Sequence, residues 1–434
     1  MVRRPAGKAH PGHARRITDR RPRPSPGRVF DVASKSRTAG PAQGLALLLP
    51  STMSVMGVVV LAPVLPQMLA HFKDMPQADY WVPMILTTPA LCVALFSAPA
   101  GWLADRFGRR RLLMLSMLLY AVCGVAPLVL DDFRAILASR VVVGVTEAAV
   151  MTLTTTLIGD YFRGHQREKW LALQTAVASI SAVALFVIGG ALGAISWRAP
   201  FAVYASSLLL LAGIRFFTWE PEETEDVLHH PEAHRTVALP WARLGGICAI
   251  TAFAAVLFYT VQVDLSLALT GRGVTDPAAI GGMTAAASLA VPVGTIAFQR
   301  LSGLPVAMLL LMAFALCGAG FSGMALATGH GWLLASVALA QFGCGLILPT
   351  LLTWALRGLA FEIRGRATGL WQASFFVGQF LSAFVVTTLS HRFGDIFSAF
   401  LGLAIASGIA AALALGGLAL MGNRAQETIA PGVR

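Results

Sequence analysis

The chain of 434 residues contains twelve apolar stretches, each long enough to cross a lipid bilayer as a helix. Only structures that satisfy their own backbone hydrogen bonds can span hydrocarbon, and for stretches of about 20 residues that structure is the α-helix. Hydrophobic residues form 56% of the chain and charged residues 12%, roughly half the charged fraction of a soluble protein. The sequence therefore predicts an all-α membrane protein and argues against a water-soluble globular enzyme.

The apolar stretches form two groups of six, separated by an acidic connection. We expect spans at 44–70, 81–103, 111–130, 134–160, 169–194, 198–219, 242–270, 279–300, 305–328, 331–357, 367–390 and 394–421. Ile136-Leu137-Ala138-Ser139 matches Leu333-Leu334-Ala335-Ser336 at the offset that separates the first and seventh spans. The predicted organisation is a pair of pseudo-symmetric six-helix bundles, 44–219 and 241–421, with an arm (1–43), a linker (220–240) and a tail (422–434).

The basic residues of the loops predict the orientation. Loops on one side carry Arg106, Arg109, Arg110, Arg111, Arg163, Arg167, Lys169, Arg235, Arg243, Arg300, Arg357, Arg364 and Arg366. The opposite loops carry only Lys73, Arg134, Arg198, Arg272 and Arg392. By the positive-inside rule we expect a multi-pass protein of the cytoplasmic (inner) membrane, with the linker and both termini in the cytoplasm.

The net charge of +12 does not indicate a nucleic-acid partner, because most of it lies in residues 1–40. This proline-rich arm lacks apolar periodicity, so we expect it to be disordered. It is interpreted as a cytoplasmic arm near anionic headgroups, an over-long start assignment or an organelle transit peptide. The cysteines form no CxxC motif, and the linker histidines His229, His230 and His234 lie among solvated acidic residues. No metal or cofactor is expected.

The loop between the second and third spans carries the most specific motif, Gly101-Trp-Leu-Ala-Asp105-Arg106-Phe-Gly108-Arg109-Arg110-Arg111. Its glycines permit close helix approach and a tight turn, and Asp105 can pair with Arg109 one helical turn later. From its charges alone, it is equally consistent with an anchor loop. The full pattern resembles motif A, GxLaDrxGrkxxl, of the major facilitator superfamily. The corresponding loop of the second half departs from it, with Ser302 and Pro305 at the Asp and Gly positions.

That resemblance implies a rocker-switch secondary transporter with a cavity between its two bundles. Motif A would latch the cytoplasmic side in the outward-open state. The residues in this gate would be Gly101, Asp105, Arg106, Gly108, Arg109 and Arg110.

The fourth span contains two charges, Arg140 and Glu147, which lie about two turns apart on one helix face. Such charges normally face a cavity or a partner, so we expect Glu147 to carry the coupling proton and Arg140 to tune it. A buried ion pair that only orients the span is the alternative. Arg140-x-x-x-Gly144 also resembles motif B of the superfamily, and Gly144-x-x-Glu147-Ala148 resembles a pattern of some uptake and lipid-export branches.

Other polar residues inside the spans are candidates for the substrate cavity. These are Gln174, Asp264, Gln341 and Gln372. Hydrogen bonds between helices would explain each glutamine equally well. Asp264 lies near the outer end of its span, where a solvated rim position is the simpler interpretation.

The predicted function is secondary active transport of small organic molecules by a monomer, with proton-coupled efflux of amphipathic compounds favoured. Its partners would be the substrate, protons and the lipid bilayer, and no catalytic residue is expected. The alternative is proton-coupled uptake of an organic anion. The fifth span favours this alternative, because only Gly189-Gly190 remains of the GxxxGPxxGG pattern of exporters and Phe186 replaces its proline. A membrane enzyme or a transport-inactive sensor lacks supporting features in the sequence.

Overall fold

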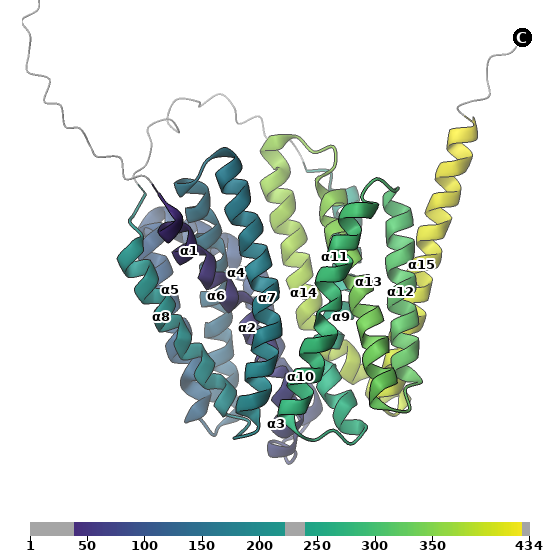
Figure 1. The fold of residues 1–434 in the computed structure, drawn as a ribbon, viewed down its shortest axis with the longest axis horizontal. Coiled ribbons are helices and arrows are strands. Elements are labelled where there is room, and N and C mark those ends of the chain that lie inside the picture. Colours follow the sequence, from purple (N-terminus) through teal and green to yellow (C-terminus); the bar gives the residue numbers. More distant parts are fainter. Residues whose placement is uncertain (1–38, 222–238, 428–434) are drawn as a thin grey trace, which may run out of the picture. The chain divides into compact units, whose positions relative to one another are not determined.

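The computed structural model describes residues 39–221 and 239–427, and within these ranges every regular element is helical (Figure 1). Twelve of its helical segments are long and apolar enough to cross a membrane. The predicted spans match them to within a few residues at their ends. Most of the basic arm, the acidic linker with its three histidines, and the last residues of the tail lie outside the described residues.

The first span is broken into short helices by three prolines, Pro50, Pro63 and Pro66, which cannot continue the backbone hydrogen-bond pattern. Its pieces are α1 (Pro41–Leu48), η1 (Leu49–Thr52), α2 (Met53–Val59), η2 (Ala62–Val64) and α3 (Leu65–His71). The rest of the N-terminal bundle consists of α4 (Ala78–Phe107), α5 (Arg109–Val125), η3 (Ala126–Leu128), α6 (Phe133–Tyr161), α7 (Gly164–Gly193), η4 (Ala199–Ala205) and α8 (Ser206–Phe217).

In the C-terminal bundle the first span is one continuous helix. This bundle contains α9 (Trp241–Gly271), α10 (Pro277–Ser288), α11 (Ala290–Leu301), α12 (Val306–Ala325), α13 (His330–Leu356), α14 (Phe361–Phe393) and α15 (Ile396–Glu427). Pro292 explains why the eighth span is divided into α10 and α11. Each bundle has its own apolar core, so each is held together mainly by its own helices.

The two bundles contact each other through α4 with α14 and through α7 with α10. The contact between α7 and α10 requires glycine at two positions, Gly190 and Gly281. A Cβ at Gly190 would lie 2.5 Å from the Pro277 carbonyl oxygen, and a Cβ at Gly281 would lie 2.4 Å from that of Phe186. Any larger residue at either position would force the backbones apart, so the remaining Gly189-Gly190 pair has a packing role here.

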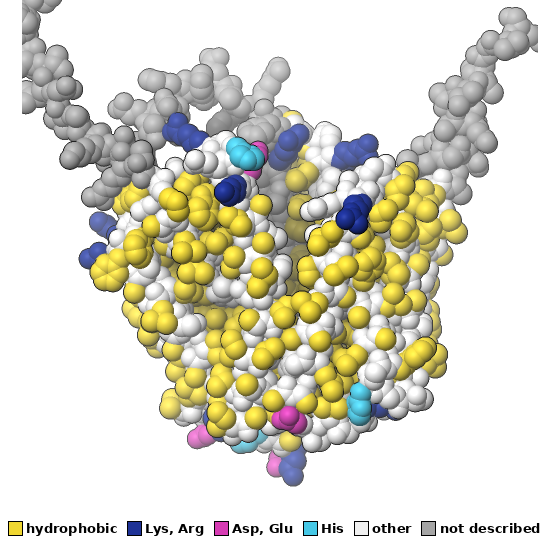
Figure 2. Space-filling model, in the orientation of Figure 1, with side chains coloured by type: hydrophobic (Ala, Val, Ile, Leu, Met, Phe, Trp, Pro, Cys, Tyr) yellow, Lys and Arg dark blue, Asp and Glu magenta, His cyan; other side chains and the backbone are white. Residues whose placement is uncertain are grey.

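The two ends of the bundles differ. The motif end carries the loop after α4, together with Arg163 and Arg243, and the far end carries Asp79, Asp131 and His391. On the face shown in Figure 2, the surface is hollowed between the bundles at the motif end, where dark-blue basic side chains gather. These two ends are the two sides that the loop charges distinguish in the sequence.

Candidate transport site

The motif loop makes a tight turn at Gly108. This residue has φ +92°, a left-handed conformation that favours glycine, and a Cβ there would lie 3.3 Å from the Glu220 carboxylate. Gly101 differs, because an added Cβ would meet its nearest atom, in Thr152, at an ordinary 3.8 Å. The predicted turn is therefore present at Gly108, whereas the close helix approach expected at Gly101 is not found in this conformation.

Arg109 is the centre of the polar contacts at the motif end. Its guanidinium lies 3.1 Å from Asp105, the local pair that the spacing predicted, and donates to both carboxylate oxygens of Asp160 at 2.7 and 2.6 Å. The backbone N–H groups of Arg109 and Arg110 donate to the carboxylate of Glu220 at 2.6 and 3.1 Å. These contacts stay inside the N-terminal bundle, and Asp105 remains 66% exposed.

The other two arginines assigned to the gate, Arg106 and Arg110, make different contacts. Arg110 donates to Thr218 Oγ1 at 3.2 Å and to the Arg215 carbonyl at 2.8 Å, so it ties α5 to the end of α8. Arg106 lies over the ring of Phe107, 5.8 Å from its centroid, and is exposed. Arg110 is therefore a structural contact in this conformation, whereas Arg106 faces outward.

Arg140 is fully buried inside the N-terminal bundle. Its guanidinium donates to the carbonyls of Cys123 and Gly124 at 2.8 and 3.0 Å and lies about 5 Å from the rings of Phe201 and Tyr204. Its remaining terminal nitrogen, Nη1, has no hydrogen-bond partner among the described residues. The partners of this arginine thus come from α5 and η4, on the side of α6 away from the C-terminal bundle.

Glu147 is 4% exposed and makes no ion pair with Arg140. Its Oε2 has no hydrogen-bond partner within the described ranges, and a Cβ on Gly57 would lie 3.5 Å from that oxygen. Within the described residues the two side chains form no direct ion pair, although Arg140 still acts on the Glu147 carboxylate electrostatically. The carboxylate points instead toward α2, in the space that α2, α4 and α6 enclose.

The surroundings of Glu147 reach the contact between the bundles. Ala148 packs with Ala90 and Val93 of α4 and with Phe376 of α14, and Tyr259 of α9 is close enough to interact with Glu147 electrostatically. Gly144 permits this packing, because a Cβ there would lie 2.6 Å from the backbone of Pro89. The glutamate thus lies where α4 and α6 of one bundle approach α9 and α14 of the other.

The uncharged cavity candidates behave differently from one another. Gln174 is bonded to α6, at 3.3 Å from Thr155 Oγ1 and 3.4 Å from Thr154 Oγ1, which favours its helix–helix interpretation. Gln341 is 1% exposed, and neither atom of its amide has a partner among the described residues. Gln372 is half-buried on α14. Of the three, Gln341 has the most unused hydrogen-bonding capacity.

Asp264 is not the solvated rim residue that its position suggested. Its side chain is 2% exposed, because α3, α4 and α14 cover the end of α9, and Oδ2 has no partner in the described structure. It lines a cavity of 360 Å³ at the far end, together with Asp79, Thr387, Ser390 and His391. The position of a residue along a helix could not reveal this cover, which comes from helices of both bundles.

Two polar contacts join the bundles beside that cavity. His391 Nε2 lies 3.3 Å from Asp79 Oδ2, and the Thr387 hydroxyl donates to the Asp79 carbonyl at 3.2 Å. The ring of His391 also stacks on Tyr80, with centroids 5.3 Å apart. The far end is thus closed by α4 and α14, whereas the polar contacts of the motif loop stay within one bundle.

The family model described as the Major Facilitator Superfamily matches residues 47–383. This chain belongs to the major facilitator superfamily. The sequence predicted this family and its twelve helical spans.

Among curated members of the superfamily, the chain is 31% identical to the class C tetracycline resistance protein of Escherichia coli over 214 residues, 48% of this chain and 52% of that protein. It is 28% identical to the quinolone resistance protein NorA of Staphylococcus aureus over 159 residues, 37% and 40% of the two chains. The matches thus span about half or less of these relatives.

A solved structure of a D-xylose–proton symporter superimposes with a TM-score of 0.72 at 14% identity, over 86% of this chain and 96% of that chain. This likeness shows the superfamily fold and nothing about the substrate.

Two residues of the site, Asp160 and Glu220, were missed by sequence reasoning. Both are acidic residues at predicted span ends on the side of the motif, and that shared location is the signal that could have indicated them.

Proposed function

We propose that the protein is a proton-driven exporter of small amphipathic organic molecules, acting as a monomer in the cytoplasmic membrane by alternating access. The motif end would face the cytoplasm, as the loop charges favour. In the described conformation the far end is closed by Asp79 and His391, and the surface is hollowed at the motif end. Such an arrangement fits the inward-open member of an alternating pair.

The observation that carries this proposal is the unpaired, buried carboxylate of Glu147. A carboxylate without a partner in a bilayer is expensive when charged and tolerable when protonated or wetted. A group with those two states can take a proton on one side and release it on the other when access changes. Because Glu147 lies beside the contact between bundles, its charge can influence which way they close.

We assign Gly101, Asp105, Arg106, Gly108, Arg109 and Arg110 to the gate at the motif end. Asp105 is exposed and paired only with Arg109, so it is free to meet the C-terminal bundle when that end closes. Gln341 and Gln372 are the residues we favour for polar contacts with the substrate. Asp264 is a further candidate, which the substrate would reach from the far end of the molecule.

Export is favoured over uptake by two observations. The relatives are named for resistance to tetracycline and quinolones, which are amphipathic organic molecules. Uptake of an organic anion would need a cation for its carboxylate, and Arg140 is turned away from the space between bundles into the carbonyls of α5. Uptake remains the alternative because the glycine–proline pattern of the fifth span is incomplete, with Phe186 fully buried at the proline position.

Transport in membrane vesicles tests both the coupling residue and the direction. Inverted vesicles with an acidic lumen are supplied with ethidium, tetracycline or ciprofloxacin, and uptake is measured with and without the proton gradient. We expect gradient-dependent accumulation by the native chain and its loss in Glu147→Gln, which retains the shape but cannot titrate. Glu147→Asp should retain part of the activity because it keeps a carboxylate.

Exchange without a gradient separates coupling from folding. The Glu147→Gln protein should still exchange labelled for unlabelled substrate, since the amide blocks only proton transfer. Native pH dependence in this variant would remove the coupling role from Glu147. Accumulation confined to right-side-out vesicles with an inward proton gradient would replace export by uptake.

A further inference from the structure

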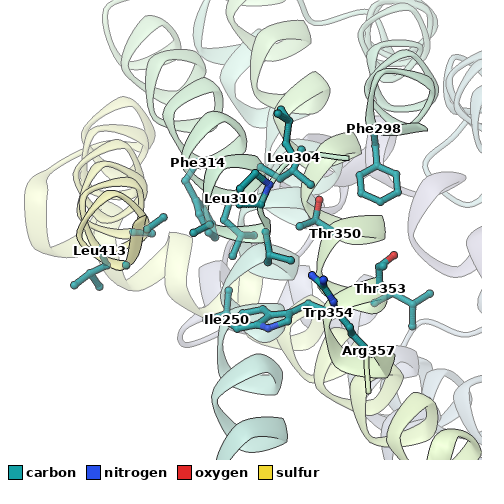
Figure 3. Close-up of a pocket in the computed structure, with 18 of the residues that line it drawn as sticks. Ile250, Phe298, Leu304, Leu310, Phe314, Thr350, Thr353, Trp354, Arg357 and Leu413 are labelled. Carbon is teal, nitrogen blue, oxygen red and sulfur yellow. The ribbon is translucent and has the colours of Figure 1, made fainter. Parts of the chain in front are cut away.

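A large cavity lies inside the C-terminal bundle and not between the bundles. It has a volume of 1870 Å³ and is bounded by α9, α12, α13 and α15, with the loop at Ser302–Pro305 at one end (Figure 3). Ile250, Leu310, Phe314 and Leu413 form much of its apolar wall. None of the proposed coupling, gate or substrate residues lines it.

Three arginines line the same cavity at the motif end. Arg243 begins α9, Arg357 follows α13 and Arg364 lies in the first turn of α14. Arg243 donates to the carbonyls of Trp354 and Arg357, both at 2.7 Å, and Arg364 donates through Nε to the Leu359 carbonyl at 3.1 Å. These bonds hold the three helix ends together while most of the guanidinium donors stay free. No aspartate or glutamate is among the described residues that line the cavity.

The cavity is bordered by a helix that faces the bilayer. Ile409 and Leu413 of α15 both line it and are 58% and 72% exposed. Figure 1 shows α15 at the edge of the bundle, leaning away from its neighbours toward the motif end. In a membrane, molecules would therefore reach this cavity sideways from the lipid rather than along the path between the bundles.

We propose that this cavity binds an anionic phospholipid of the surrounding bilayer. Its acyl chains lie against the apolar side chains of α12 and α15, and its phosphate is bound by Arg357 and Arg364. The volume exceeds the roughly 300–1,000 Å³ of pockets for drug-sized ligands, which suits a two-chain lipid. Arginine forks match phosphate oxygens, and basic pockets between helices at the membrane surface are suited to anionic headgroups.

Trp354 lines the cavity beside these arginines and reports on lipid binding. The full chain is reconstituted in phosphatidylcholine vesicles that contain increasing fractions of chain-brominated phosphatidylglycerol, whose bromines quench tryptophan fluorescence. The signal of a Trp354→Phe variant is subtracted to isolate this residue. We expect saturable quenching at low mole fractions of the anionic lipid, and much weaker quenching by brominated phosphatidylcholine at the same fractions.

Charge removal identifies the headgroup contact. Arg357→Gln and Arg364→Gln should each weaken the apparent affinity for phosphatidylglycerol about fivefold. Arg366→Gln is the matched control, because Arg366 is an exposed arginine of α14 that does not line the cavity. Since Arg357, Arg364 and Arg366 are all exposed, the three variants are expected to fold, and their circular dichroism should match that of the native chain.

Three results would overturn the proposal. Equal quenching by the two lipids would remove the preference for anionic lipid, and an equal loss in Arg366→Gln would reduce it to general surface charge. A change of Trp354 fluorescence on addition of soluble dodecyl phosphate, with no quenching by brominated phosphatidylglycerol, would assign the cavity to a free amphipathic anion.

Discussion

Arg140 and Glu147 lie seven positions apart on α6 and differ in their hydrogen bonds. The arginine is neutralised by carbonyl dipoles and aromatic rings within its own bundle, whereas the glutamate has an oxygen with no described partner. A change in the arrangement of the bundles is therefore expected to alter the surroundings of Glu147 more directly than those of Arg140, because Glu147 lies beside the contact between the bundles. Asp105 lies at the membrane surface, where it forms an ion pair with Arg109 of its own bundle.

The gate assignment predicts that Asp105→Asn slows turnover more than it weakens substrate binding. The variant loses a charge that would act on the equilibrium between conformations and not on the cavity. In vesicle transport, kcat should fall several-fold while KM changes little. Glu168→Gln is the matched control, since this acid is also exposed at the motif end, with 81% of its side chain accessible. A raised KM with normal kcat would place Asp105 in substrate binding instead.

The long helices α4 and α14 connect the far end to the middle of the membrane. Near their ends, Asp79 meets His391, and further along them Ala90 and Phe376 pack beside Ala148. Closure at the far end and the surroundings of Glu147 thus share one pair of helices. Pro83, Pro89 and Pro99 interrupt the hydrogen bonding of α4, which gives this helix places to bend.

Removal of the contact at the far end should expose the cavity next to it. In Asp79→Asn, a cysteine placed at Ser390 should react about two- to fivefold faster with an impermeant maleimide, as expected for the loss of a surface ion pair.

Asp131→Asn is the control for this experiment, because Asp131 pairs with Arg198 at the same end but within one bundle. Equal acceleration in both variants would show that local loosening, and not separation of the bundles, exposes Ser390.

The helices and the local pair Asp105–Arg109 could be predicted because both depend on spacing along the chain. Apolar length determines a span, and a four-residue separation places two side chains on one helix face. The contact between Arg109 and Asp160 joins residues of different helices, and the burial of Asp264 depends on α3, α4 and α14. Rotation and packing of the helices decide such contacts, and no local pattern records them.

At the scale of the whole described structure, the two ends are unequal. The far end is joined across the bundles, and the motif end holds its ion pairs within one bundle. The glycine contact between α7 and α10 keeps the bundles close without a polar bond. A few contacts at one end therefore stabilise one conformation of an alternating pair. A modest change in free energy can shift the equilibrium between the two conformations.

The orientation predicts which end is accessible from outside a cell. Single cysteines at Thr328, in the loop before α13, and at His165, at the start of α7, are both exposed and lie at opposite ends. In intact cells an impermeant maleimide should label Thr328→Cys and not His165→Cys, while lysis should allow both. The native cysteines are buried or half-buried and provide the background measurement. The reverse pattern would invert the assigned topology.

The carbonyls that receive Arg140 belong to α5, the span made just before α6. On the scale of insertion by the translocon, an arginine at the centre of a lone helix costs about 2.5–3.5 kcal/mol. That penalty falls once the preceding helix lies alongside and its carbonyls accept the guanidinium. We therefore expect α5 and α6 to enter the lipid together as a helical hairpin. Arg140, which is buried in the folded bundle, would in this way influence the order in which the helices insert into the membrane.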